Sequence, residues 1–291
     1  MNAAALLPVA VHGVPRSGTS WLGEILNSSP HTRYCFQPLF SYALQGFLDA
    51  EASAARIEAF WQRLATLDDD FVGQRAARAA GRLPDFAKGR CTHLVYKEVR
   101  YHHILPNLLA RAPRTRLVAI VRHPLATLAS WFDAPREFRA DLGWQPLEEW
   151  RDAPRKNAGR PEEYNGYARW KEAALLFHAL AAAHPGRVCL VEYAALCAAP
   201  ARETERLFAF LGLAPQAQTA RFLQASRGEH HADAYSVFRA RADDDGWRGR
   251  LPPAIVAAVA DDLRGSVLEG YLRFSAADWR RLAAGRAPTP S

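Results

Sequence analysis

A buried strand, a tight glycine turn and a helix start follow one another within residues 6–27, and this succession restricts the fold more than any other part of the sequence. The run LLPVAVHG (6–13) is almost continuously apolar and predicts a buried β-strand. Apolar residues then recur at helical spacing from Trp21 to Leu26, which predicts a helix, and Pro30 is expected to end it. Parallel α/β sheets are built from such strand–turn–helix units, so we expect a fold of this class.

Three further apolar runs predict buried strands: HLVY (93–96), RLVAIV (116–121) and VCLVEY (188–193). Helices are expected between and after them, near 103–111, 123–132, 168–183 and 201–211. Strands that alternate with helices indicate a mostly parallel sheet with both faces covered. The fold class predicted is therefore α/β, a P-loop-like three-layer sandwich whose mostly parallel central sheet is flanked by helices.

Two long segments depart from this alternation. Residues 39–81 carry apolar positions at helical spacing and predict a helical insertion, whereas 133–166 are rich in Pro, Gly, Arg and Glu and predict an irregular insertion. A chain of 291 residues with both insertions is compatible with one domain, which we place at 1–285. The last residues, 286–291, are expected to be a disordered tail.

The composition narrows the class of ligand. The formal net charge of +7 suits an anionic ligand, and no basic run interleaved with aromatic residues suggests nucleic acid. The four cysteines lack the spacing of metal ligands, so we expect no metal and a reducing, cytoplasmic compartment. No apolar run reaches the roughly 18–20 residues of a membrane span, so no integral membrane span is predicted. The oligomeric state is left open.

The turn GVPRSGTS (13–20) has the frame of a phosphate-binding loop without its lysine. Backbone N–H groups and the helix dipole converge at such a turn and bind anions. In nucleotide kinases the loop reads GxxxxGK[ST], and its lysine reaches the β- and γ-phosphates. Here Thr19 follows Gly18 in the place of that lysine, and the strand 116–121 ends in Arg122 and His123 rather than in an acidic magnesium ligand. The loop therefore fits one phosphate carrying an attached group better than a triphosphate.

Arg16 is the charged residue inside the turn, and a second basic position lies elsewhere in the chain. The guanidinium of Arg16 could stabilise an oxygen that gains charge as a bond to phosphate breaks. Arg122 ends the strand 116–121, and Ser130 lies about two helical turns into the next helix. Anion sites at the ends of two neighbouring strands imply a ligand with two well-separated phosphates.

These segments resemble the sulfotransferases that use 3′-phosphoadenosine 5′-phosphosulfate (PAPS). Their P-[RK]-S-G-T-[ST]-W segment is similar to PRSGTSW (15–21), and their R-x-P…S segment is similar to 122–130. The resemblance implies that the single domain is a sulfotransferase domain and that PAPS is the sulfuryl donor, without a metal. It implies cofactor binding by Pro15, Arg16, Ser17, Gly18, Thr19, Ser20, Trp21, Arg122, Ser130 and Tyr193.

The catalytic groups are matched less completely. VYKEVR (95–100) resembles a family segment whose lysine approaches the transferring group, which implies a role for Lys97 beside Arg16 in stabilising the transition state. Many members carry a carboxylate soon after the first helix, where this chain has Gln37. Glu98 is our first candidate for the general base, although it alternates with Lys97 along a strand and only one of the two is expected to face the site. The next candidates for the base are His102, His103 and His12. We expect His102 and His103 to lie at the surface.

The acceptor is the least determined partner. Arginine in the loop favours the carbohydrate and protein-tyrosine branches over the small-phenol branch. The helical insertion 39–81 and the tryptophan-rich segment 133–170, with Trp131 just before it, are expected to shape the acceptor site. We expect a hydroxyl of a carbohydrate or glycolipid, with a tyrosyl side chain or another small-molecule hydroxyl as the alternative. A P-loop kinase with a degenerate loop and a non-catalytic nucleotide-binding protein are the more distant alternatives.

Overall fold

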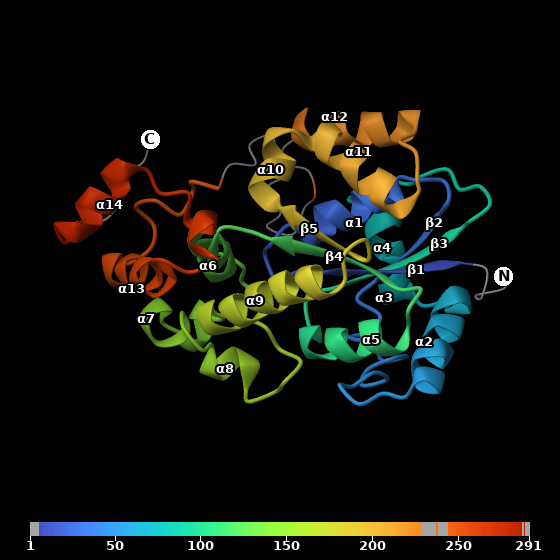
Figure 1. The fold of residues 1–291 in the computed structure, drawn as a ribbon, viewed down its shortest axis with the longest axis horizontal. Helices are drawn as coiled ribbons and strands as arrows, with labels where there is room; N and C mark the ends of the chain where they lie inside the picture. Colours follow the sequence, from blue (N-terminus) through green and yellow to red (C-terminus); the bar gives the residue numbers. More distant parts are fainter. Residues whose placement is uncertain (1–5, 229–236, 238–243, 287, 289–291) are drawn as a thin grey trace.

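Five parallel strands form the central sheet, in the order β2-β3-β1-β4-β5 (Figure 1). The computed structural model describes residues 6–228, 237, 244–286 and 288. The strands are β1 (Leu7–His12), β2 (Thr32–Phe36), β3 (His93–Glu98), β4 (Arg116–Val121) and β5 (Val188–Glu192). The predicted α/β class and the four predicted strands are confirmed, and the sheet is parallel throughout.

The sequence analysis did not predict strand β2. The segment of β2, TRYCF, lies at an edge of the sheet, where only Thr32 and Cys35 are buried. An edge strand needs no continuous apolar run, and that run was the signal that identified the other four.

Helices cover both faces of the sheet. In the N-terminal half of the chain the helices are α1 (Thr19–Asn27), α2 (Ala54–Thr66), α3 (Asp70–Gly73), α4 (Arg75–Ala79), α5 (Leu105–Arg111) and α6 (Pro124–Phe132). Next come α7 (Pro146–Glu149), α8 (Pro154–Asn157), α9 (Tyr167–Ala183), α10 (Tyr193–Ala198) and α11 (Pro200–Leu211). The last are α12 (Ala217–Gly228), α13 (Pro253–Leu263) and α14 (Ala276–Ala283).

Two apolar cores lie on opposite faces of the sheet. Val118 and Ile120 of β4 belong to the core shared with α1, α11 and α12, whereas Leu117 and Ala119 belong to the core shared with α2, α5 and α9. Figure 1 shows the first group of helices above the sheet and the second group below it. This alternation is what a strand buried on both faces requires, and it makes the three layers.

The two insertions differ in structure. Residues 39–81 contain turns followed by α2, α3 and α4, and Phe60 of α2 is buried against Tyr96 of β3. Residues 133–166 contain only one-turn helices, among them α7 and α8. Of the expected disordered tail, 287 and 289–291 lie outside the described residues.

The strand order places a ligand site. β1 and β4 are neighbours, but β1 connects through α1 to β2 on one side, while β4 connects through α6 and α9 to β5 on the other. In open α/β sheets, ligands bind outside the carboxyl ends of strands at such a reversal. The loop 13–18 follows β1 and Arg122 follows β4, so both predicted anion sites lie at this point.

Candidate active site

The turn between β1 and α1 depends on two glycines. A Cβ on Gly13 would lie 2.8 Å from the backbone oxygen of Ile120, and Gly18 has φ +87°. A Cβ on Gly18 would lie 2.4 Å from Cδ2 of Tyr193, so the aromatic ring packs directly on the turn. Glycine is required at both positions because backbone and ring approach too closely for any side chain. The first N–H groups of α1, which have no partner within the helix, stand at the end of this turn.

Serine and threonine side chains of the turn have structural contacts of their own. The Ser17 hydroxyl donates to the carbonyl oxygen of Val14 (2.6 Å), which closes the turn from within. Thr19 is buried and its methyl group lies against Gly13, while Ser20 is partly exposed at the start of α1. Of the predicted binding residues in the loop, Ser17 and Thr19 therefore also maintain its shape.

Arg16 connects the two predicted anion sites. Its backbone is left-handed (φ 70°), which a non-glycine residue seldom adopts. Its Nε donates to Oγ of Ser130 (3.1 Å), and its carbonyl oxygen accepts a hydrogen bond from Nη1 of Arg122 (2.9 Å). The structure thus brings Arg16, Arg122 and Ser130 into direct contact from three separate segments.

The guanidinium of Arg122 has a protein carboxylate as its partner. Its Nε donates to Oδ1 of Asp244 (2.7 Å), and both side chains are mostly buried. Burial raises the pKa of Asp244, and the charge of Arg122 opposes this shift. Trp170 donates from Nε1 to the carbonyl oxygen of Arg122 (3.0 Å), which fixes the backbone at the end of β4. Asp244 was not singled out from the sequence.

Two aromatic residues lie beside these charges. The Arg122 guanidinium lies over the ring of Tyr193, 4.6 Å from its centroid. Trp21 meets Tyr193 edge to face, at 6.4 Å between ring centroids, and its Nε1 donates to Oγ of Ser226 (3.0 Å). Tyr193 and Trp21 are both buried, so they form a fixed wall next to the glycine turn.

Lys97 and Glu98 end β3 and are both buried. Nζ of Lys97 lies over the ring of Phe36, 4.1 Å from its centroid, and burial lowers the pKa of Lys97 to about 7. Burial raises the pKa of Glu98 to about 8. The hydrogen bond that its Oε1 accepts from the backbone N–H of Leu39 (2.8 Å) acts in the opposite direction and lowers this pKa. An uncharged form is favoured in each case because charge is poorly solvated there.

Gln37 and two of the candidate histidines have internal partners. Oε1 of Gln37 accepts a hydrogen bond from Nη1 of Arg100 (3.2 Å). His12 and His102 are fully buried and share a hydrogen bond (2.9 Å between Nδ1 atoms), so the expected surface position of His102 was wrong. The ring of His102 also packs against that of Tyr164, with 4.3 Å between their centroids. Burial lowers the pKa of His12 to about 3, which keeps it neutral.

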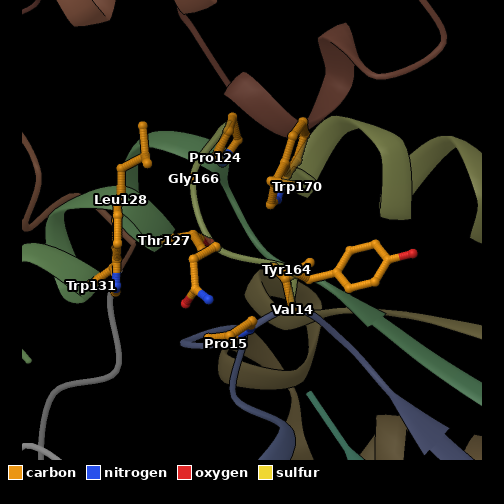
Figure 2. Close-up of a pocket in the computed structure, with 10 residues that line it drawn as sticks. Val14, Pro15, Pro124, Thr127, Leu128, Trp131, Tyr164, Gly166 and Trp170 are labelled. Atoms are coloured by element: carbon orange, nitrogen blue, oxygen red, sulfur yellow. The ribbon is translucent and has the colours of Figure 1, made fainter. Parts of the chain in front are cut away.

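A small pocket borders the glycine turn, α6 and the segment 164–170 (Figure 2). Its lining residues are Val14, Pro15, Pro124, Thr127, Leu128, Trp131, Tyr164, Asn165, Gly166 and Trp170. Two buried polar atoms of this lining, Nε1 of Trp131 and Oδ1 of Asn165, have no hydrogen-bond partner among the described residues. The lining is thus mainly apolar and contains one donor atom and one acceptor atom without a hydrogen-bond partner among the described residues.

Within the described ranges, no helix is both long and apolar enough to cross a membrane, and no group of three or more His, Cys, Asp or Glu side chains is placed to bind a metal ion.

A comparison of the sequence with models of known protein families identifies the family of this chain. Residues 8–217 match the model of the Sulfotransferase family, which is more than half of the chain. The chain therefore belongs to the sulfotransferase family. A search of the curated proteins by sequence found no match.

Solved structures share the fold at low identity. Mouse sulfotransferase SULT7A1 complexed with PAP has a TM-score of 0.53 at 16% identity, covering 91% of this chain and 88% of the other. Retinol dehydratase in a complex with retinol and PAP has a TM-score of 0.53 at 14% identity, covering 90% and 82%. These likenesses concern the fold, and the roles of individual residues rest on the geometry above.

Proposed function

We propose that this chain transfers the sulfuryl group of PAPS to an acceptor hydroxyl and releases adenosine 3′,5′-bisphosphate (PAP). The observation that supports this most is the direct connection of Arg16, Arg122 and Ser130 at the point where the strand order reverses. In a ligand with two separated phosphates, one phosphate would contact the loop of Arg16 and the other would contact Arg122 and Ser130. The neighbours solved with PAP share this fold.

The residues present fit such a donor. Residues 15–21 would hold the 5′-phosphosulfate, Arg122 and Ser130 the 3′-phosphate, and Tyr193 would lie beside the adenine or its ribose. The Arg122 site already accommodates one anion, the Asp244 carboxylate, next to the Tyr193 ring. Bound PAPS supplies an activated sulfuryl group and a good leaving group.

Arg16 and Lys97 have the roles of stabilising charge. For an in-line transfer with a loose transition state, positioning and electrostatic stabilisation dominate, by analogy with phosphoryl transfer. Arg16 would contact the oxygen that becomes anionic as the donor leaves, and Lys97 would add a second positive charge. An anion near Lys97 favours its protonated form, so donor binding would raise its depressed pKa.

For the acceptor we propose a hydroxyl of a carbohydrate or glycolipid, with a tyrosyl side chain or another small-molecule hydroxyl as the alternative. Trp131 and Trp170, two of the tryptophans expected to shape the acceptor site, line the pocket beside the loop. Aromatic walls accommodate sugar faces and aryl groups alike. The four free cysteines support the proposal of a cytoplasmic location.

The function is tested with ³⁵S-labelled PAPS. Wild-type protein is expected to release PAP and transfer the label to a carbohydrate or glycolipid fraction, and Arg16→Ala to lose this activity. Arg202→Ala is the matched control because that side chain is 76% exposed on α11. Binding of PAPS without any release of PAP by the wild type would instead identify a non-catalytic protein.

A further inference from the structure

The proton of the acceptor hydroxyl needs a base, and several of the residues considered from the sequence are poorly placed for it. Gln37 is an amide engaged by Arg100, and His12 and His102 are buried against each other. Glu98 is fully buried, holds the Leu39 backbone, and its pKa is raised to about 8. Its carboxyl group is therefore mostly protonated at neutral pH and cannot accept a further proton.

A different carboxylate reaches the site from the irregular insertion. Oε1 of Glu137 lies 4.0 Å from Nη1 of Arg16, the residue that connects the two anion sites. Glu137 also opposes the lowering of the Lys97 pKa that burial causes, and it does the same for Lys156, so its charge is close to both amines. The carboxylate thus lies beside Arg16, one of the two cations expected to stabilise the transferring group.

The second oxygen of this carboxylate lacks a partner. Oε2 of Glu137 is buried and accepts no hydrogen bond from any residue that the structure describes, although the side chain as a whole is 24% exposed. A buried acceptor atom without a donor is unusual in a protein and requires an explanation. A hydroxyl donor that arrives with the substrate would provide it.

The backbone holds Glu137 in this position. Its N–H donates to the carbonyl oxygen of Ala134 (2.8 Å), and so does the N–H of Phe138 (2.8 Å). Phe138 is buried between Trp131, Phe132 and Trp144, with ring centroids 4.9 to 5.9 Å away. The turn is therefore anchored in the core, as the positioning of a catalytic group requires.

We propose that Glu137 is the general base of the reaction, an inference that rests on the proposed sulfuryl transfer. Its carboxylate takes the proton of the acceptor hydroxyl as the acceptor oxygen bonds to sulfur and the bond from sulfur to the phosphate oxygen of the donor breaks. The electron pair of that bond leaves with PAP, and Arg16 and Lys97 face the charge it carries. Arg16 also orients the carboxylate through its contact with Oε1.

The test compares acceptors that need a base with one that does not. Release of PAP from PAPS is measured with water, phenol and 4-nitrophenol, the last being largely ionised already in weakly alkaline buffer. Glu137→Gln is expected to lower kcat with water and phenol by about 10²–10⁴-fold, the usual contribution of a base, and to change it little with 4-nitrophenol. Added formate should partly restore turnover to Glu137→Ala.

Controls separate this proposal from the function on which it rests. PAP affinity, measured by calorimetry, should stay close to that of the wild type in Glu137→Gln, and Glu148→Gln, an exposed glutamate of the same insertion paired with Arg155, should resemble the wild type throughout. An equal loss with all three acceptors, no loss, or an acceptor-dependent loss in Glu98→Gln instead would overturn the role of Glu137. A wild type that releases no PAP with these acceptors and none with the carbohydrate or glycolipid fraction would refute the sulfuryl transfer itself.

Discussion

The two proposed anion sites are built in different ways. The loop site uses the backbone of 13–18, held by two obligatory glycines and by the Tyr193 ring. The second site uses the side chain of Arg122, which the structure shows paired with Asp244. The first site is thus fixed by the fold, whereas binding at the second must compete with a carboxylate of the protein. Arg16, through Ser130 and Arg122, contacts both.

Removing the Arg16 side chain, which connects the two sites, should have the largest effect on the rate. Arg16→Ala is expected to lower kcat by about 10²–10³-fold, the usual loss on removing one donor that faces a developing anion. Because the glycine turn is held by other residues, the affinity for PAP should change much less. Single-turnover kinetics with PAPS measure the first quantity and calorimetry the second. A loss of affinity that equals the loss of rate would contradict this separation.

The second site is tested by Arg122→Ala. Hydrogen bonds to charged groups contribute about 1.5–3 kcal/mol, so the affinity for PAP should fall by roughly 10- to 100-fold. The affinity for 5′-AMP, which lacks the 3′-phosphate, should be almost unchanged. The rate at saturating PAPS should fall less than the affinity. Equal losses for PAP and 5′-AMP would show that Arg122 does not bind the 3′-phosphate.

The proposed role of Lys97 can be tested through the pH dependence of kcat/KM. Burial lowers the pKa of Lys97 to about 7, so the free enzyme carries this charge below that pH and loses it as the pH rises through it. Since kcat/KM reports the free enzyme, kcat/KM for PAPS should fall about tenfold between about pH 6 and 8. Lys97→Arg, whose guanidinium stays charged, should flatten this limb. A profile that is the same in both proteins would exclude Lys97 as its origin.

Competition at the second site predicts a gain of affinity. Asp244→Asn frees Arg122 and should strengthen PAP binding about fivefold, equivalent to about 1 kcal/mol. The melting temperature without ligand should fall, because a buried guanidinium loses its partner, and its increase with PAP should grow. Asp245→Asn is the control, since Asp245 is 57% exposed and paired with Arg248. Weaker PAP binding in Asp244→Asn would mean that Asp244 instead positions Arg122 for the phosphate.

The smallest effect is expected for Ser130→Ala. The hydroxyl accepts one hydrogen bond from Arg16, and its loss corresponds to about 0.5–1 kcal/mol, or roughly a two- to fivefold weaker binding of PAP. Titration of both proteins under the same conditions measures this. A loss as large as that of Arg122→Ala would make the serine an equal partner in the second site.

The difference between the sites also explains what the sequence could predict. The glycine turn is local, so GVPRSGTS and its flanking strand and helix indicate both structure and ligand class. The opposite faces expected of Lys97 and Glu98 follow from strand alternation alone. Asp244 and Glu137 lie 122 and 121 positions from the arginines that they approach, and only the packing of distant segments brings them there. The edge strand β2 and the burial of His102 depend on the same long-range packing.

The claim of a two-phosphate donor is tested most directly by titrating the wild-type protein with PAP, 5′-AMP and ATP, each with and without magnesium. PAP should bind without magnesium and roughly tenfold or more tightly than 5′-AMP, because the second phosphate gains the Arg122 site. Binding of ATP that requires magnesium, with PAP no tighter than 5′-AMP, would contradict a sulfuryl donor and indicate a nucleoside triphosphate instead.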